Sequence, residues 1–507
     1  PKFAIALSSQ RPSPRLRGEV SFLRRLLAVL VVGAGQAVVS PDAAAIEPKT
    51  AERLVTEVGR ARWTEHNTVE LLADPRRAWE ARVDLAEAAR HHLLISVFSW
   101  HNDEYGKRYR RILRAQLKER KKEGTEFTVR VLADASALTS FSTAFRSLEK
   151  DGAKVRGFNR SSWGMTPLYE GRMHDKIIVS DGREAIVGGR NFSDDYFEPQ
   201  HWWFDLGVRL EGPAVDDLQM IFLKSWEFTE FNRKMGRFLL PQEMLLDDLR
   251  VFWRTGRYPN GSSPMAKFMT PEFFPQREQI PGGLKVAVLY DNPLLRRRAA
   301  GTDLVVALVD HAEEHVELMT PFPNFPDELT ESLVAAVERG VTVRLLVNDR
   351  EAAIRGGPFL LAAYPALIRL IEAGAEVWAW RANKDVIAQI NQSECRPTLM
   401  PPIAIHGQML RVDDEISIIH SSNFNIRSTY YNTEAGVAVL GHFFNRKLGD
   451  LVDELIALKD FELDCSNGDH GPEVPALLGR LTREDIPLMR EELGGKQKFL
   501  DAWSVAW

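Results

Sequence analysis

Two histidine-centred segments occupy matching positions in the two halves of this chain. In each segment, a histidine is followed by an aspartate and then by an asparagine at the same spacing. The two sets are His174, Asp181 and Asn191, and His406, Asp413 and Asn423. The differences 406 − 174, 413 − 181 and 423 − 191 all equal 232 residues. Three chemically matched residues in one register indicate a duplicated unit with one histidine in each copy.

The residues two positions after the histidines add hydrogen-bond donors. Side chains alternate along a strand, so Lys176 lies on the same face as His174, and Gln408 on the same face as its own histidine. Phosphodiester chemistry needs this set: donors for the non-bridging oxygens, a nucleophile for phosphorus, and a group with a pKa near neutral that protonates the leaving oxygen. The aspartates of the two sets lie an odd number of residues from their histidines. They face the other way on a straight strand, so we interpret them as structural.

Residues 174–181, with the pattern His-x-Lys-x(4)-Asp, resemble the HKD motif of the phospholipase D superfamily. The match continues over residues 188–197 (GGRNFSDDYF) and on to Asp205, a longer stretch that resembles bacterial cardiolipin synthases and related phospholipase D-like proteins. Residues 422–428 (SNFNIRS) and 432–434 resemble the segment after the second motif of that family. Two registered copies of such a motif are far more specific than one.

The resemblance implies an α/β fold with two similar phospholipase D-type domains. Each would be a mixed, mostly parallel β-sheet flanked by helices, and a pseudo-two-fold axis would relate the two around one active site. One histidine would attack phosphorus and form a phosphohistidine. The other would protonate the leaving alcohol and then activate water or an acceptor alcohol. We take His174 as the nucleophile, because its motif is intact, and His406 as the general acid and base. Neither a metal nor another cofactor is expected.

The same resemblance assigns the remaining candidate residues. Asp205 and Glu434 would orient the imidazoles, as in other sets of nucleophile, base and orienting group. Further catalytic candidates are Lys176, Asn191 and Asn423; substrate-binding candidates are Gln408, Gly189 and Ser422; structural candidates are Asp181 and Asp413.

The second motif departs from the family pattern. Gln408 stands where the family has lysine, and His420-Ser421 stands where it commonly has Gly-Ser. Glutamine donates hydrogen bonds but brings no charge, and a charge-assisted hydrogen bond is about twice as strong as a neutral one. The second half site is therefore weakened, specialised or disabled.

Strand and helix patterns alternate in both halves, which favours α/β domains with largely parallel sheets. Expected strands are residues 68–72, 93–100, 127–132 and 154–158 in the first half and 284–289, 315–319, 341–347 and 375–380 in the second. Expected helices are residues 76–90 and 105–123 and a helix from Asp327. The expected organisation is a signal-like or membrane-proximal leader (1–50), an N-terminal domain (51–256), a Pro- and Gly-rich linker (257–283), a C-terminal domain (284–465) and a tail (466–507).

The first 50 residues combine a basic stretch, the short apolar run of residues 26–39 and small residues at 43–45, which are the parts of a secretory signal. The alternatives are an uncleaved membrane anchor and a buried helix. The signal interpretation predicts an exported (periplasmic or secreted) or membrane-associated protein, and the resemblance to bacterial cardiolipin synthases implies a bacterial one. Cys395 and Cys465 are too few for a disulfide framework or a zinc site, and their pairing stays open.

Composition narrows the partners. The chain is 44% hydrophobic and 27% charged, which is typical of a soluble globular protein. Its net charge of -5 disfavours bulk binding of nucleic acid. The expected partners are a phospholipid and a water or alcohol acceptor, with peripheral membrane contact. The alternatives are a nucleic-acid phosphodiesterase of the same superfamily and a degenerate, non-catalytic member that binds lipid or protein.

Residues 107–122 carry nine basic side chains on an expected amphipathic helix. The basic face of this helix is either solvated or a contact for anionic lipid.

Overall fold

The computed structural model describes most of both halves. The described residues are 45–134, 145–158, 171–234, 266–277, 279–292, 298–350, 352, 357–382, 386, 388–390, 400–460 and 476–496. The signal-like run at residues 26–39 and both cysteines lie outside these ranges. Within them, none of the helices combines the length and the apolar character that a membrane crossing requires.

Strands and helices alternate as the sequence predicts. The strands of the first half are β1 (Trp63–Leu71), β2 (His92–Val97), β3 (Thr128–Asp134), β4 (Lys154–Phe158), β5 (Arg172–Met173), β6 (Ile177–Ser180), β7 (Glu184–Gly188), β8 (Trp203–Phe204) and β9 (Gly207–Glu211). Those of the second half are β10 (Leu284–Asp291), β11 (His315–Met319), β12 (Thr342–Asn348), β13 (Glu376–Trp380), β14 (Ala404–Ile405), β15 (Met409–Val412), β16 (Ile416–His420), β17 (Asn432–Leu440) and β18 (Leu478–Leu481).

The helices lie between these strands. They are α2 (Pro48–Glu57), α3 (Pro75–Ala88), α4 (Glu104–Lys122), α7 (Asp194–Phe197), α8 (Ala214–Lys234), α10 (Ala300–Asp310), α11 (Asp327–Glu338), α12 (Gly357–Ala362), α13 (Tyr364–Ala373), α15 (Ile426–Tyr430), α16 (His442–Ala457) and α17 (Ile486–Leu493), with 3-10 turns η2 (Ala266–Phe268) and η4 (Leu458–Asp460).

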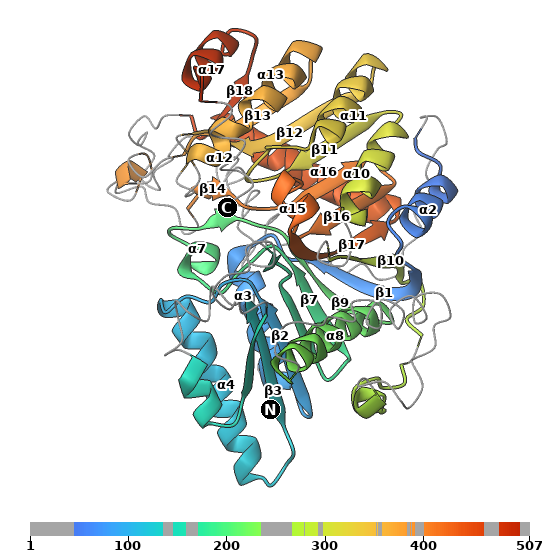
Figure 1. Cartoon of the computed structure of the whole chain (residues 1–507), viewed down its shortest axis with the longest axis vertical. Helices are drawn as coiled ribbons and strands as arrows, with labels where there is room; N and C mark the ends of the chain where they lie inside the picture. The colour runs from blue at the N-terminus through green and yellow to red at the C-terminus, as the bar shows by residue number, and fades with distance from the viewer. Residues whose placement is uncertain are drawn as a thin grey trace, which may run out of the picture.

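One continuous sheet joins the two halves. Its order is β18-β13-β12-β11-β15-β16-β17-β10-β1-β9-β7-β6-β2-β3-β4. Counted outward from the antiparallel β1–β10 junction, the order β1-β9-β7-β6-β2-β3-β4 repeats as β10-β17-β16-β15-β11-β12-β13. In Figure 1 most of the first half (blue to green) lies below this junction and most of the second half (yellow to red) above it, while the blue helix α2 lies beside the second half. This repeated order confirms the expected pair of similar α/β domains.

The sheet is mixed, as expected, but it contains less parallel pairing than the sequence predicts. Along this order, parallel pairs occur only within β2-β3-β4 and β11-β12-β13. The cause is local, because tight turns follow β6 and β15 and return the chain antiparallel to itself. Asp181 and Asp413 occupy these turns with φ of 51° and 46°.

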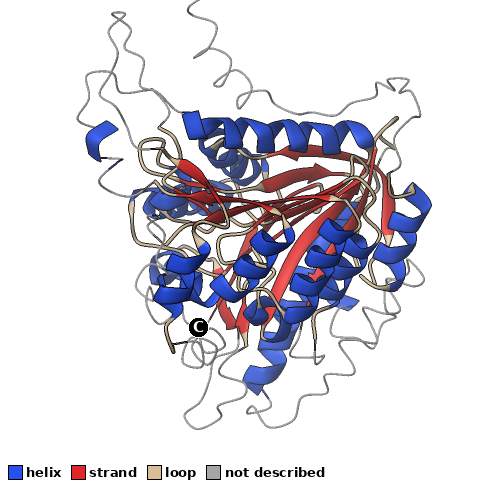
Figure 2. Ribbon diagram, turned by 90° about the horizontal axis from the view of Figure 1, so that it is seen from above, coloured by secondary structure: helices blue, strands red, loops and turns tan. Residues whose placement is uncertain are grey.

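Helices cover both faces of the sheet, as Figure 2 shows from above. In the first half, α3 contacts β6 and β7 and α4 contacts β3, while α8 contacts β2, β4, β6, β7 and β9. Strands enclosed in this way are buried on both faces, so they consist of nearly continuous apolar residues. All four residues of β6 and all four of β15 are buried. These two strands directly follow the motif histidines and so give them a rigid base.

Two segments near the expected domain boundaries are integrated into the fold. Helix α2 packs against α10 of the second half, and the N–H of Ile46 donates to Asp413 (2.7 Å). The described part of the expected linker packs against the first half, where Phe273 is buried and stacks on His92 with 4.3 Å between ring centroids. The domain boundaries themselves stay a prediction.

Candidate active site

Short parallel strand pairs bring each motif histidine to the opposite half of the molecule. Strand β5 pairs with the start of β17, and β14 pairs with β8. The backbone N–H of His174 donates to the carbonyl of Thr433 (3.0 Å), and that of His406 donates to the carbonyl of Phe204 (2.7 Å). In both cases the accepting residue immediately precedes a candidate orienting carboxylate. The same main-chain geometry therefore occurs twice, once from each half.

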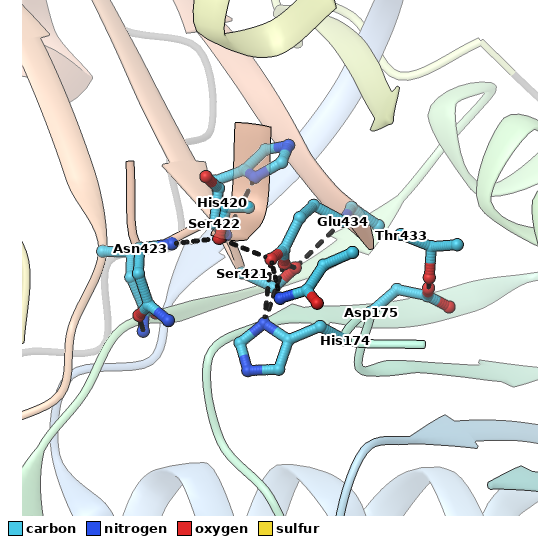
Figure 3. Close-up of polar contacts among 12 residues, drawn as sticks. His174, Asp175, His420, Ser421, Ser422, Asn423, Thr433 and Glu434 are labelled. Atoms are coloured by element: carbon cyan, nitrogen blue, oxygen red, sulfur yellow. Dashed lines mark hydrogen bonds and ion pairs between the residues drawn. The ribbon is translucent and has the colours of Figure 1, made fainter. Parts of the chain in front are cut away.

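Each histidine bonds to a carboxylate of the other half. Nδ1 of His174 lies 2.9 Å from Oε2 of Glu434, and Nδ1 of His406 lies 2.8 Å from Oδ2 of Asp205. Figure 3 shows the first of these contacts, with Glu434 reaching down to the His174 ring. Both carboxylates are completely buried, while the two histidines keep 8% and 7% exposure. The crossed pairs make one site from two halves.

The His174–Glu434 pair is electrostatically matched for a neutral imidazole. Burial lowers the pKa of His174, although the charge of Glu434 opposes this effect. Burial alone would raise the pKa of Glu434, but the nearby His174 and Lys176 and a hydrogen bond from Ser421 lower it to about 2. An ionised Glu434 accepts a hydrogen bond from the N–H at Nδ1, which keeps the proton there and leaves the lone pair of Nε2 for an electrophile.

Three further donors hold the Glu434 carboxylate. Ser421 Oγ donates to Oε2 (2.5 Å), and Oε1 accepts from Ser428 Oγ (2.7 Å) and from Asn432 Nδ2 (3.2 Å). With both oxygens occupied, the carboxylate cannot rotate away from His174. The sequence-based assignment did not include Ser428 or Asn432, although both lie in the segments that resemble the second motif.

Lys176 supplies a buried positive charge. Its Nζ donates to the backbone carbonyl of His174 (2.7 Å) and lies 5.8 Å from the ring centroid of Phe98. Burial lowers the pKa of Lys176 to about 8, against the influence of Glu434, Asp205 and Asp175. The Lys176 ammonium thus lies close enough to Glu434, Asp205 and Asp175 to interact with their charges.

Gln408 takes the corresponding place in the second half. It is fully buried, and its Nε2 donates to Oδ1 of Asn423 (3.0 Å). Its Oε1 has no hydrogen-bond partner among the described residues. A Cβ at Gly189 would meet both this oxygen and the Asp205 carboxylate, so glycine at that position makes room for both.

Asn191 reaches the site through a residue that sequence reasoning missed. Its Oδ1 accepts the N–H of Ser99 (3.0 Å) and its Nδ2 donates to the hydroxyl of Tyr196 (3.1 Å). That hydroxyl lies 3.3 Å from Nε2 of His406. The indole of Trp203 stacks on the same imidazole with 5.7 Å between centroids. Tyr196 lies inside the quoted stretch GGRNFSDDYF, so its position in the motif was the available signal.

The other candidates contact the backbone. Asp181 accepts N–H groups of Arg90, His91 and His92, and Asp413 accepts those of Glu313, Glu314 and His315. Both carboxylates thereby anchor the start of the strand next to their own. Ser422 Oγ accepts the N–H of Phe424 (3.0 Å), which shapes the turn after β16. Next to it, burial lowers the pKa of His420 to about 4, and its Nδ1 accepts the N–H of Ser422.

Across the described ranges, no cluster of three or more histidine, cysteine, aspartate or glutamate side chains has the arrangement of a metal site.

A protein-family model described as "Cardiolipin synthase, PLD-like domain" matches the chain over residues 83–226 and 305–456. The chain belongs to this phospholipase D-like family. The two matched segments contain the two motif histidines. The expected superfamily is therefore confirmed, and the chain is an enzyme of the phospholipase D or cardiolipin synthase kind.

Similar proteins extend this result. Cardiolipin synthase A of Pseudomonas entomophila is 25% identical over 416 residues, which cover 81% of this chain and 72% of the relative. Cardiolipin synthase of Listeria innocua is 23% identical over 409 residues, which cover 79% and 71%. The crystal structure of phosphatidylserine synthase from Haemophilus influenzae matches with a TM-score of 0.59 and 13% identity, covering 90% of this phospholipase D-like chain and 99% of that one. At that identity the structural match speaks for the fold alone.

Proposed function

We propose that this enzyme cleaves a phospholipid phosphodiester and transfers the phosphatidyl group to water or an alcohol through a phosphohistidine on His174. The observation that carries the proposal is the crossed pairing of two histidines with two buried carboxylates of the opposite halves. The relatives named cardiolipin synthase, matched over most of both chains, support phospholipid as the substrate class and favour transfer over hydrolysis.

In the first step, the lone pair of His174 Nε2 attacks phosphorus. The bond between phosphorus and the leaving oxygen breaks, its electron pair stays on that oxygen, and the oxygen takes a proton from Nε2 of His406. The second step runs in reverse with a new alcohol or water. Its hydroxyl gives a proton to His406 as its oxygen attacks phosphorus, and the electron pair of the nitrogen–phosphorus bond returns to His174.

Donors next to the strands stabilise the charge that develops on the non-bridging oxygens. The Lys176 ammonium is the strongest of these, because a charge-assisted hydrogen bond exceeds a neutral one. Asn423 is half-buried, and its amide nitrogen bonds to none of the described residues, so it is available to a phosphate oxygen. Glu434 and Asp205 keep the imidazoles oriented through both steps.

The proposal includes contact with a bilayer, because a phospholipid substrate resides there. The basic helix α4 and the signal-like leader are the candidates for that contact. Several charges of α4 are already paired, for example Arg114 with Asp151 and Arg111 with Glu104, so the helix alone would attract anionic lipid weakly.

The test is incubation with vesicles of phosphatidylglycerol and phosphatidylethanolamine, with and without added glycerol, followed by mass spectrometry of the lipids. We expect phosphatidic acid from hydrolysis and new phosphatidyl-alcohol products from transfer, and none of these with His174→Ala. Cleavage of a labelled oligonucleotide without lipid turnover would instead favour the nucleic-acid phosphodiesterase. A folded protein that binds vesicles but turns over neither substrate would favour the non-catalytic alternative.

Metal removal provides a separate test. The nucleophile, the acid and the phosphate donors are all side chains of this chain, so exhaustive chelation with EDTA should leave the rate unchanged. Loss of the rate with chelator and its recovery on addition of Mg²⁺, Ca²⁺ or Zn²⁺ would contradict the proposed mechanism.

A further inference from the structure

The pseudo-symmetry of the site is broken on the two short helices that follow the motif asparagines. Helix α7 begins after Ser193, and α15 begins after Asn425, which holds the corresponding position. The third residue of each helix points into the site, and it lies five residues after the motif asparagine in both halves. In α15 this residue is Ser428, and in α7 it is Tyr196. Equivalent positions of the two helices therefore carry a hydroxyl group on a short side chain in one half and on a long side chain in the other.

The two hydroxyl groups reach different targets. Ser428 Oγ donates to the carboxylate of Glu434 (2.7 Å), the partner of the first histidine. The Tyr196 hydroxyl instead lies 3.3 Å from Nε2 of His406, the histidine that pairs with Asp205. Both ring nitrogens of His406 thus have protein partners. Nε2 of His174 has none among the described residues.

We propose that Tyr196 is a positioning residue that makes the two histidines unequal: it holds His406 for proton transfer and leaves His174 as the nucleophile. This inference rests on the proposed function of the site. A nitrogen already engaged by a hydroxyl is a poor nucleophile, because its lone pair is shared with the donor. A phenol also donates to a neutral imidazole and accepts from a protonated one, so Tyr196 suits His406 in both states of an acid–base cycle.

The surroundings of Tyr196 fix its hydroxyl in place. Asn191 Nδ2 donates to the phenolic oxygen (3.1 Å), and the ring packs edge-on against His406 and Trp203. Burial raises the pKa of Tyr196 well above 10, so the hydroxyl keeps its proton and changes only the direction of its hydrogen bond. The leaving or attacking oxygen replaces it at Nε2 during proton transfer.

Helix α7 is itself tied to the start of α4. The N–H of Asp194 donates to the carboxylate of Asp103 (2.9 Å), and the N–H of Tyr105 donates to the carboxylate of Asp194 (2.8 Å). Each aspartate thus caps the other helix. This reciprocal contact anchors the helix that carries Tyr196, although α7 has a single turn.

The first test uses the resting protein and needs no turnover. In the full chain labelled with 15N-histidine, NMR reports the chemical shift of each Nε2, and the His174→Ala and His406→Ala variants assign the two signals. We expect Tyr196→Phe to shift the Nε2 signal of His406 and to leave that of His174 unchanged. The matched control is Tyr109→Phe, which removes a buried hydroxyl that donates to the Arg82 carbonyl (3.1 Å). An unchanged His406 signal in folded Tyr196→Phe would overturn the proposal.

The second test maps the covalent intermediate. After rapid quenching with dioctanoyl-phosphatidylglycerol, mass spectrometry should find the phosphatidyl label on His174 alone in the parent and partly on His406 in Tyr196→Phe. The kcat of the variant should fall about tenfold, with a smaller change in KM, as expected for loss of one hydrogen bond to the acid–base group. Label on His406 in the parent, or parental kcat and labelling in the variant, would overturn the inference. Absence of both label and turnover in the parent would overturn the proposed function, while the NMR shift still decides the contact.

Discussion

The half site around His174 and the half site around His406 share a backbone plan and differ in where their polar side chains act. Around His174 the donors converge on the carboxylate, since Ser421 and Ser428 both bond to Glu434. Around His406 the corresponding positions hold a glycine and a tyrosine, and the tyrosine contacts the imidazole instead. The first half site therefore fixes the carboxylate of Glu434 and leaves Nε2 of His174 without a partner among the described residues. In the second half site, Tyr196 contacts Nε2 of His406.

Charge separates the two half sites in the same way. Lys176 places an ammonium beside His174, whereas the fully buried Gln408 beside His406 is neutral. A nucleophilic step gains from a cation that stabilises the negative phosphorane. The neutral Gln408 supplies no such charge beside His406, so the second half site stabilises the phosphorane less. In the proposed mechanism, the two copies of one repeated strand order therefore take different chemical roles because a few side chains differ.

The largest expected effect compares the two histidines directly. His174→Ala should lower turnover by at least about 10⁴-fold, because no other group on the described strands replaces the nucleophile. His406→Ala should also be slow but should accumulate phosphatidyl label on His174, because the intermediate forms and then lacks a base. Single-turnover kinetics with peptide mapping measures both, and circular dichroism checks the fold. Near-parental turnover in folded His174→Ala would eliminate the proposed site.

The two carboxylates test whether the half site around His174, where three donors hold Glu434, contributes more to kcat than the half site around His406. Glu434→Gln should reduce kcat by about 10³-fold, because it removes the ionised partner of the nucleophile and the acceptor for three donors. Asp205→Asn should cost less, about 10²-fold, since its histidine keeps the contact with Tyr196. Glu184→Gln, at a carboxylate paired with Arg209 away from the site, is the control. Equal losses in the two variants would mean that the half sites contribute alike.

Periodicity located the elements, because apolar runs and helical spacing depend on neighbours in the chain. The strands at residues 154–158 and 315–319 were predicted with the bounds they have. Strand direction was harder to predict from the sequence. The apolar pattern of the extended segments after each histidine is the same whether the chain continues parallel or turns back. The turns at Asp181 and Asp413 decide this, and they depend on backbone N–H groups of another strand.

For a similar reason, the sequence predicted only part of the candidate site. Motif spacing named both histidines, and the family resemblance added Asp205 and Glu434 as candidate orienting carboxylates. It could not say that each carboxylate serves the histidine of the opposite half, because that pairing arises from β5 on β17 and β14 on β8. Tyr196 was overlooked because its partner is 210 residues away in sequence.

Gln408→Lys tests the difference in charge. A lysine there would carry a cation to the side of His406, and we expect turnover to rise by about tenfold. The gain is limited because Gln408 is enclosed by Gly189 and Asn423, so the longer side chain must displace its neighbours. Gln408→Met, neutral and of similar length, is the matched control and should not gain. An unchanged or lower rate in folded Gln408→Lys would mean that glutamine is the functional residue of this half site.

The smallest expected effect concerns pH and arises from the same asymmetry. Because burial lowers the pKa of Lys176 to about 8, its ammonium is lost as the pH rises through that value. The phosphate then faces neutral donors on both sides, so kcat/KM should fall by about half at pH 8 and further above it. On the acidic side, burial lowers the pKa of His174, so the proposed nucleophile stays neutral at a more acidic pH than an exposed histidine would. Lys176→Arg keeps its charge throughout this range, so its alkaline limb should disappear even if its maximal rate is lower. The measurement is kcat/KM between pH 5 and 10 at constant ionic strength. A limb near pH 8 that persists in Lys176→Arg would assign the titration to another group and would remove the charge difference as the basis for unequal half sites.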